Sequence, residues 1–286
     1  MIAVIGSQGL LGRHVMAHLV RSGYTVVTSS HRPGADVCID LREPVKPFPF
    51  RFRNVSWAVL CSAISGLDQC ARDVAGSYRF NVVHTIEFIE QLFHHHVVPI
   101  FCSSDLVFAG ISGNYAEHDP RNPSTEYGRQ KKIVEDYLLG QDRPWIILRL
   151  SKLYATTPDD RSPIGDTVRR LQYGERVRCA VDQMITPTYV QDVARIIEWC
   201  IRTNRRGCYH VAGPQSMTRY ELGLKIAKRL QAEARIERCS IAELNLSEIR
   251  PLNNTLDTHK LRSDYDGSLT TLDECLSEIL QLPVER

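Results

Sequence analysis

The sequence predicts an α/β protein with a Rossmann-type, doubly wound parallel sheet and a small, mixed C-terminal domain. Short apolar strands alternate with helical patterns through the first half of the chain, and a glycine-rich turn follows the first strand. After residue 150 this rhythm changes. Alternating strands and helices favour a parallel sheet, because parallel strands need a long connection that is usually a helix.

The expected elements of the first half follow from apolar patterning. Short apolar runs predict strands over residues 2–6, 24–28, 56–62, 97–102 and 145–150. Between them, helical periodicity predicts helices over residues 10–22, 77–95 and 124–139. Asn81 is expected early in the second helix, where its amide either caps the helix or orients a water molecule next to a lysine.

The second half predicts a return to the first domain and then a separate small one. After a loop over 156–163 and a short helix, a helix is expected from about 186–192 to 200 and a strand over 208–211. The capping box at Thr218 and Glu221 predicts a helix ending near 230, with a strand near 234–239 and a helix near 271–280. We expect a dinucleotide-binding domain over 1–155 plus about 181–212, and a substrate domain over 156–180 and 213–286.

Composition excludes several classes of protein. The 286 residues are 43% hydrophobic and carry a net charge of +2, with basic and acidic residues dispersed. Without a basic stripe, nucleic acid is not an expected partner. No apolar run approaches the ~20 residues of a membrane span, and no basic leader precedes the first strand, so we expect a cytoplasmic protein. The nine cysteines contain no Cys-x-x-Cys pair and are expected to be buried free thiols.

The glycine-rich turn predicts a phosphate-binding site. Gly6, Gly9 and Gly12 follow the first strand and open a helix together with Leu10 and Leu11. Such a turn lets backbone approach a pyrophosphate, which then lies at the positive N-terminus of the helix. The alternative is a tight turn that binds no ligand.

Residues after the second and third strands indicate which dinucleotide is bound. An NAD enzyme usually has an acidic residue after the second strand, but His31 and Arg32 stand there. A cationic end suits a 2′-phosphate, so NADPH is favoured and NADH is the alternative. Asp40 and Leu41 are expected near the adenine amino group, although Asp40 would also suit a surface loop. Ser62, the last residue of the strand expected over 56–62, and Ala63 complete the expected cofactor site.

A hydroxyl, a phenol and an amine indicate carbonyl chemistry. Tyr127 and Lys131 are four residues apart and share a helix face, so we expect the Lys131 ammonium to favour ionisation of the phenol. Ser103 and Ser104 end the strand before this helix, where a hydroxyl can donate to a substrate carbonyl or cap the next turn. This order predicts a reductase in which Tyr127 donates a proton.

Three consecutive histidines suggest a metal site at first sight. Residues 94–96 end the second expected helix. Consecutive side chains on a helix point about 100° apart, and no nearby Cys or acid completes a tetrahedral set. We therefore expect helix-end histidines that complement the helix dipole, and no metal.

Several segments resemble one enzyme family. Residues 103–110 (Ser-Ser-Asp-Leu-Val-Phe-Ala-Gly) are similar to the Ser-Thr-Asp-Tyr-Val-Phe-Asp-Gly signature of dTDP-4-dehydrorhamnose reductases, a family of extended short-chain dehydrogenases/reductases. Residues 115–123, 182–192 and 250–261 resemble later landmarks of that family. The resemblance covers almost the whole chain. It implies that Ser104 polarises the carbonyl, Tyr127 donates the proton, and Lys131 contacts Tyr127 and the nicotinamide ribose.

The family resemblance implies reduction of a nucleotide-linked 4-keto-deoxysugar, and it is compatible with a homodimer. Ser104, Asp105, Leu106 and Lys152 are the expected substrate-binding residues. Leu106 replaces the family's tyrosine, and Lys152 stands where the family has a tryptophan, so a different sugar is expected.

Two alternatives remain open. The first is a nucleotide-sugar epimerase or dehydratase of the same superfamily. Dehydratases commonly have Asp-Glu after the catalytic hydroxyl, whereas Leu106 follows Asp105 here. The second is a non-catalytic, dinucleotide-binding regulatory subunit.

Overall fold

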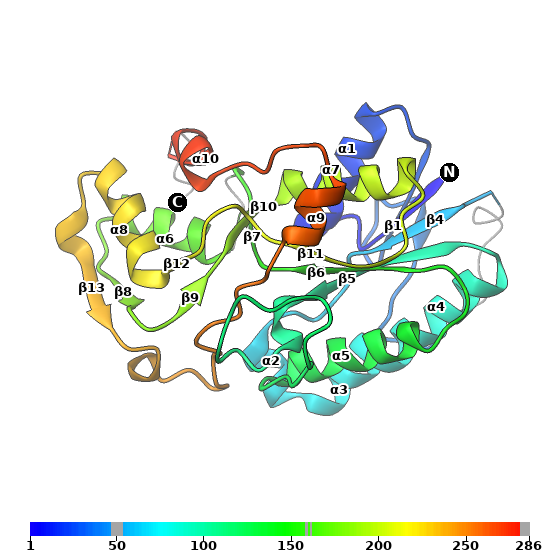
Figure 1. The fold of residues 1–286 in the computed structure, drawn as a ribbon, viewed down its shortest axis with the longest axis horizontal. Helices are drawn as coiled ribbons and strands as arrows, with labels where there is room; N and C mark the ends of the chain where they lie inside the picture. The colour runs from blue at the N-terminus through cyan, green and yellow to red at the C-terminus, as the bar shows by residue number, and fades with distance from the viewer. Residues whose placement is uncertain (47–53, 158–159, 161, 281–286) are drawn as a thin grey trace.

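A seven-stranded parallel sheet lies between the helices in the larger part of the molecule (Figure 1). The computed structural model describes residues 1–46, 54–157, 160 and 162–280. The strand order is β11-β6-β5-β4-β1-β2-β3. The strands are β1 (Ile2–Ile5), β2 (Val26–Ser30), β3 (Val37–Cys38), β4 (Trp57–Leu60), β5 (Val98–Ser104), β6 (Ile146–Leu150) and β11 (Gly207–Val211). The order reverses at β1, which opens a crevice at the carboxyl ends of β1 and β4.

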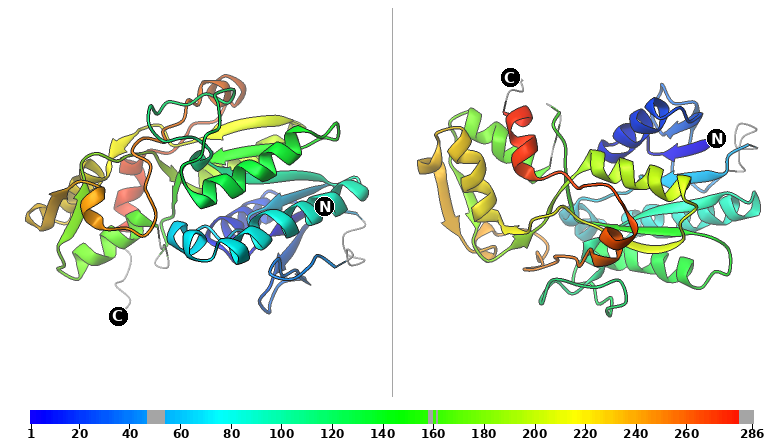
Figure 2. Two further views of the ribbon diagram at one scale, coloured as in Figure 1. Left: turned by 90° about the horizontal axis from the view of Figure 1, so that it is seen from below. Right: turned by 45° about the horizontal axis from the view of Figure 1, so that its top comes forward.

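Helices cover both faces of this sheet (Figures 1 and 2). One face carries α1 (Leu10–Arg21), α7 (Val190–Arg202) and α9 (His259–Asp264). The other carries α2 (Leu67–Arg72), α3 (Val74–Tyr78), the π-helix η2 (Arg79–His84), α4 (Thr85–His94) and α5 (Glu126–Leu139). Alternate strand residues serve the two sides: Ile2 and Val4 pack with α1 and α7, while Ala3 and Ile5 pack with α4 and α5.

A second, smaller core lies beyond β6. It is formed by residues of α6 (Pro163–Gln172), α8 (Arg219–Arg229) and α10 (Leu272–Ile279). Three two-stranded sheets accompany these helices: β10-β7, β12-β9 and β13-β8. Their strands are β7 (Lys152–Tyr154), β8 (Val177–Ala180), β9 (Met184–Ile185), β10 (Pro187–Tyr189), β12 (Met217–Thr218) and β13 (Ile236–Cys239). The short 3-10 helices are η3 (Asp105–Val107), η4 (Glu233–Arg235) and η5 (Ala242–Leu244).

The predicted fold class is confirmed by the order and direction of the strands. We propose that the division into a dinucleotide-binding and a substrate domain follows these two cores, with α9 packed on the first core through Leu261. The capping box is confirmed, because the Thr218 hydroxyl accepts from the Glu221 amide at 3.1 Å. None of the helices in the described ranges combines the length and apolar character that a bilayer span requires.

The expected helix over 77–95 shows the largest difference in local structure. It begins earlier, at Val74, and its middle is the π-helix η2. Asn81 is therefore well inside a helical stretch, and its expected capping role was wrong. Its buried amide instead pairs with the backbone of Ile64 and donates to Gln130 Oε1 at 2.7 Å. π-Helical turns of this kind often occur at functional sites.

Cysteines and histidines are placed largely as expected. All nine cysteines are free thiols, and six are buried, but Cys38 is exposed at the edge of the sheet. Helix α4 ends at His94, with His95 as its C-cap. Among the described residues, no group of three or more His, Cys, Asp or Glu side chains is arranged to hold a metal ion.

Candidate active site

The carboxyl ends of the central strands align at one edge of the sheet. Leu60 pairs in register with Phe101 of β5, and Ser104 pairs with Leu150 of β6. A cavity of about 380 Å³ lies at this edge. Ten of the residues expected from the sequence line it: Gly9, Leu10, Leu11, Ala63, Ser104, Asp105, Leu106, Tyr127, Lys131 and Lys152. Elements that are far apart in the sequence therefore meet in one cavity.

The glycine turn is packed too tightly for side chains at Gly6 and Gly12. Gly6 has a φ of 80°, and a Cβ on it would lie 2.5 Å from Ser62 Oγ. A Cβ on Gly12 would lie 2.1 Å from the Gly6 carbonyl oxygen. Gly9 is the N-cap of α1, and no side chain caps the first turn. The amides of Gly6, Ser7 and Gly9 are bonded to backbone carbonyls, so the amides of the first turn of α1, which have no partner within the helix, are the ones that fit a pyrophosphate.

The residues expected to select the nucleotide lie outside this cavity. His31 and Arg32 are exposed after β2, where the Arg32 amide donates to Ser30 Oγ at 3.1 Å. The exposed Arg32 side chain thus lies at the carboxyl end of β2, the position that the NADPH prediction concerns.

Asp40 and Leu41 both have partners within the protein. Arg42 donates to both carboxylate oxygens of Asp40 at 2.6–3.0 Å, and this hydrogen bonding holds the pKa of the carboxyl below its ordinary value. The Leu41 side chain is buried in the core next to α4, and its carbonyl contacts His84 Nδ1. Neither residue lines the cavity.

Tyr127 and Lys131 lie on the buried face of α5. Helix α5 begins after Thr125, whose hydroxyl accepts from the Gly128 amide at 3.1 Å. Lys131 Nζ donates to the Cys102 carbonyl at 2.8 Å and lies 5.6 Å from the centroid of the Tyr127 ring. Burial lowers the pKa of Lys131 to about 8. The amine is thus held between the strand that ends in Ser104 and the phenol.

The expected effect of Lys131 on the phenol was wrong. Burial raises the pKa of Tyr127 well above its ordinary value. The lysine is directed at the Cys102 carbonyl rather than at the phenol oxygen, so its charge does not offset the loss of water around Tyr127. The phenol therefore stays protonated at neutral pH, which is the state that a proton donor requires.

Ser104 caps a turn and also faces the cavity. Its hydroxyl donates to Asp105 Oδ1 at 2.9 Å and accepts from the Leu106 amide at 3.2 Å. Asp105 Oδ2 accepts from Ser151 Oγ at 3.1 Å. Burial raises the pKa of Asp105, and the charge of Lys152 opposes this rise. Donation to a substrate carbonyl thus requires the Ser104 hydroxyl to turn away from Asp105.

A second cavity, of about 330 Å³, adjoins the first. Leu67, Asp105, Leu106, Ser151 and Lys152 line both. Arg219 and Arg250 line only the second, which lies on the side of the smaller core. Arg250 is paired with Asp68 at 2.7 Å.

The two arginines were not among the residues expected at the site. Arg219 is the first residue of α8, directly after the capping threonine. The capping box therefore predicted that it starts a helix, but not that it lines a cavity. Arg250 stands in one of the segments that resemble the family, but nothing local shows that it faces a cavity.

The fold and this cavity define an oxidoreductase-type dinucleotide-binding protein of the extended short-chain dehydrogenase/reductase class. The family model described as RmlD substrate binding domain matches residues 1–283. The chain belongs to this family.

Curated relatives span most of the chain. One is the probable low-salt glycan biosynthesis reductase Agl14 of Haloferax volcanii, which is 27% identical over 96% of this chain and 96% of its own length. Another is methionine adenosyltransferase 2 subunit beta of Mus musculus, which is 27% identical over 98% of this chain and 86% of its own length.

Solved structures share the fold. A dTDP-4-dehydrorhamnose reductase of Clostridium acetobutylicum has a TM-score of 0.87 at 20% identity, with 98% of each chain covered. The enzyme of that name from Bacillus anthracis, in complex with NADP, has a TM-score of 0.83 at 21% identity, with 97% of each chain covered. MoeE5 in complex with UDP-glucose and NAD has a TM-score of 0.83 at 21% identity, covering 98% of this chain and 97% of that one. At these identities the likeness establishes the fold.

Proposed function

We propose that the chain is an NADPH-dependent reductase of a nucleotide-linked 4-keto-deoxysugar, with NADH as the alternative cofactor. One observation carries this proposal: the glycine turn, Ser104, Tyr127 and Lys131 meet at one cavity that continues into a cationic one. Relatives and structural neighbours described as reductases support it. The expected cytoplasmic location and the homodimer belong to the proposal, to be checked by fractionation and light scattering.

Tyr127, Ser104 and Lys131 each have a separate role in the proposed carbonyl reduction. A bound dinucleotide would supply the hydride to the ketone carbon. Tyr127 is protonated and donates its proton to the ketone oxygen, while the Ser104 hydroxyl stabilises the negative charge that develops there. Lys131, fixed by the Cys102 carbonyl, is placed to bind the ribose next to the nicotinamide.

The second cavity supports a nucleotide-linked substrate. Arg219 offers its guanidinium to a diphosphate, for which planar donors are well suited, and Arg250, whose Nη1 and Nη2 donate to the Glu248 carbonyl and to Asp68, adds positive charge beside it. The charges of Lys152 and Arg250 act on one another, and burial lowers the pKa of Lys152. An anionic ligand relieves this repulsion. The sugar then lies between the arginines and Tyr127, where Leu106 and Lys152 contact it.

The site favours reduction over dehydration. Elimination of water needs a second acid–base pair beside the catalytic hydroxyl, but Leu106 follows Asp105 and presents an apolar side chain to both cavities. The non-catalytic alternative has a specific observation in its favour, namely the similarity to methionine adenosyltransferase 2 subunit beta.

NADPH oxidation separates these functions. The chain is incubated with NADPH and a panel of nucleotide-linked 4-keto sugars, and the products are analysed by mass spectrometry. A reductase yields a product that has gained two hydrogen atoms. It consumes one NADPH for each molecule of product. Binding of NADPH without reduction of any sugar would contradict the proposal and favour a regulatory subunit.

A further inference from the structure

Glu135 is a buried carboxylate with no part in the chemistry described above. It lies on α5, one helical turn after Lys131 and two after Tyr127, and its side chain is 0% exposed. Residues at this spacing share a helix face. Glu135 therefore points in the same direction as the two catalytic side chains, towards the sheet.

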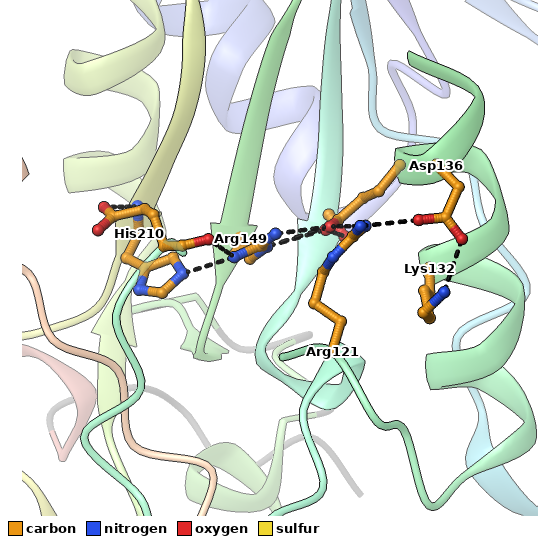
Figure 3. A network of polar contacts seen from close by, with 8 residues as sticks. Arg121, Lys132, Asp136, Arg149 and His210 are labelled. Carbon is orange, nitrogen blue, oxygen red and sulfur yellow. Dashed lines mark hydrogen bonds and ion pairs between the residues drawn. The ribbon is translucent and has the colours of Figure 1, made fainter. Parts of the chain in front are cut away.

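Its carboxylate joins three separate segments of the chain. Ser103 Oγ of β5 donates to Oε1 at 2.5 Å. Arg149 of β6 donates from Nε and Nη2 to the carboxylate at 2.9–3.1 Å, and Arg121 Nη1 donates to Oε2 at 3.1 Å. Figure 3 shows these arginines between the sheet and α5. A carboxylate with this many charge-assisted bonds has one fixed position.

The network continues beyond Arg149 to Glu117, to His210 of β11 and to Asp257. Arg149 Nη1 donates to the Glu117 carbonyl at 3.0 Å and lies 3.1 Å from His210 Nε2. Burial lowers the pKa of His210 to about 4, so the ring is neutral and its Nε2 accepts this bond. His210 Nδ1 then donates to the Asp257 carbonyl at 3.0 Å. The network thus reaches the chain that follows Arg250.

Two hydrogen bonds, made by residues one helical turn apart, hold α5 against β5. Lys131 Nζ is bonded to the carbonyl of Cys102, and Glu135 is bonded to the side chain of Ser103. The next residue of the strand is Ser104. A slide or rotation of α5 breaks both contacts, so together they determine how far Tyr127 lies from the Ser104 hydroxyl.

We propose that Glu135 is a positioning residue, which holds the helix carrying Tyr127 and Lys131 against the strand that ends in Ser104. Its charge has a second effect, because it favours the ammonium form of Lys131 and opposes the burial that lowers the pKa of that amine. The inference rests on the proposed reductase function. It assigns to Glu135 an effect on turnover and not only on stability.

The chain offers a matched control on the same helix. Asp136 also pairs with Arg121, at 2.7 Å, and with Lys132 at 2.7 Å, but its side chain is 43% exposed (Figure 3). Glu135→Gln and Asp136→Asn each remove one carboxylate charge from a partner of Arg121. Only the first disturbs the link to β5.

The experiment measures kcat, KM and their pH dependence for NADPH-driven reduction of the sugar identified in the panel. We expect Glu135→Gln to lower kcat about tenfold or more with little change in KM, as for an interaction used only in the transition state. The alkaline limb of kcat should move below pH 8. Asp136→Asn should keep the kcat and the pH profile of the wild type. Wild-type kcat in Glu135→Gln, with only lowered stability, would overturn the inference.

A second variant covers the case in which Glu135→Gln does not fold. Ser103→Ala leaves Glu135 with both arginines and removes only the bond to β5. It should lower kcat in the same direction, and in a folded double variant the two losses should not add, because they break one link. Unchanged kcat in Ser103→Ala, or fully additive losses, would contradict the proposal.

A readout that needs no turnover separates this inference from the proposed function. If the wild type reduces no sugar in the panel, the reductase proposal fails. The Lys131 titration is then followed by NMR of labelled lysine in the folded protein. A lower midpoint in Glu135→Gln than in the wild type and in Asp136→Asn supports the inference, and an unchanged midpoint overturns it.

Discussion

Replacement of Gly12 by alanine tests the glycine turn, because two effects of known size oppose each other. Gly12 lies in the first turns of α1, where alanine is intrinsically favoured over glycine by about 1 kcal/mol. In this fold, however, the added Cβ lies 2.1 Å from the Gly6 carbonyl oxygen and 2.9 Å from Ser7 Cα. Both obstacles are backbone atoms, which cannot turn aside. Overpacking of this kind costs about 1–3 kcal/mol or more, so we expect Gly12→Ala to be destabilising.

Gly9→Ala is the matched control in the same turn. The nearest atom to its Cβ would be the Gly6 carbonyl oxygen at 3.4 Å, and its φ of −74° suits any residue. Alanine at an N-cap is less favourable than glycine, typically by under about 1 kcal/mol, which is less than the clash at Gly12 costs. Gly9 lines the cavity, however, so its new methyl group lies where a pyrophosphate approaches. We expect Gly9→Ala to fold with nearly wild-type stability and to bind NADPH more weakly.

Urea unfolding, followed by tryptophan fluorescence, and calorimetric titration with NADPH distinguish the two variants. The account predicts a lower unfolding midpoint for Gly12→Ala and a near-normal midpoint with weakened binding for Gly9→Ala. A Gly12→Ala protein as stable as the wild type would show that the turn has room for a Cβ at this position, and would refute the expected clash with the Gly6 carbonyl.

Three further predictions concern the cofactor, the lysine and the substrate. Arg32→Ala should weaken NADPH more than NADH, because it removes a charge-assisted contact to the 2′-phosphate alone; equal losses in titrations with the two cofactors would exclude that contact. Because the pKa of Lys131 is about 8, its ammonium is present below pH 8 and is lost as the pH rises through that value, so kcat should fall there. A pH–rate profile tests this, and Lys131→Arg should remove the alkaline limb if the cation is what matters. Finally, Leu106 and Lys152 should make dTDP-4-dehydrorhamnose a poor substrate compared with another 4-keto sugar, and a kcat/KM of about 10⁴ M⁻¹s⁻¹ or above for it would contradict this expectation.

The catalytic side of the site was predictable because it depends on local rules. Carboxyl ends of parallel strands meet at one edge, so Ser104 and the glycine turn had to lie close together once the strands were recognised. The four-residue spacing of Tyr127 and Lys131 placed both on one face of α5. Neither inference required knowledge of the rest of the fold.

Properties that depend on burial and distant partners were not predictable in the same way. The pKa of Tyr127 rises because water is excluded around the phenol, which spacing alone does not reveal. Asp40 is held by Arg42, and either a free or a paired carboxylate suits that sequence. Arg219 comes from α8, which belongs to the smaller core. In the sequence, Glu135 is one of many acidic residues in helices. Its burial and its contacts with β5 and β6 are visible only in the structure.

Tyr127→Phe tests whether Tyr127 is the proton donor, with Tyr137→Phe as its control on the same helix. Tyr137 bonds to Glu90 and does not line the cavity, so its loss should leave kcat unchanged. For Tyr127→Phe the account predicts a kcat on the identified keto sugar reduced by about 10²–10⁴, with NADPH affinity near that of the wild type, because only the proton donor is removed. Wild-type turnover by Tyr127→Phe would contradict the assignment of Tyr127 as the acid and the mechanism built on it.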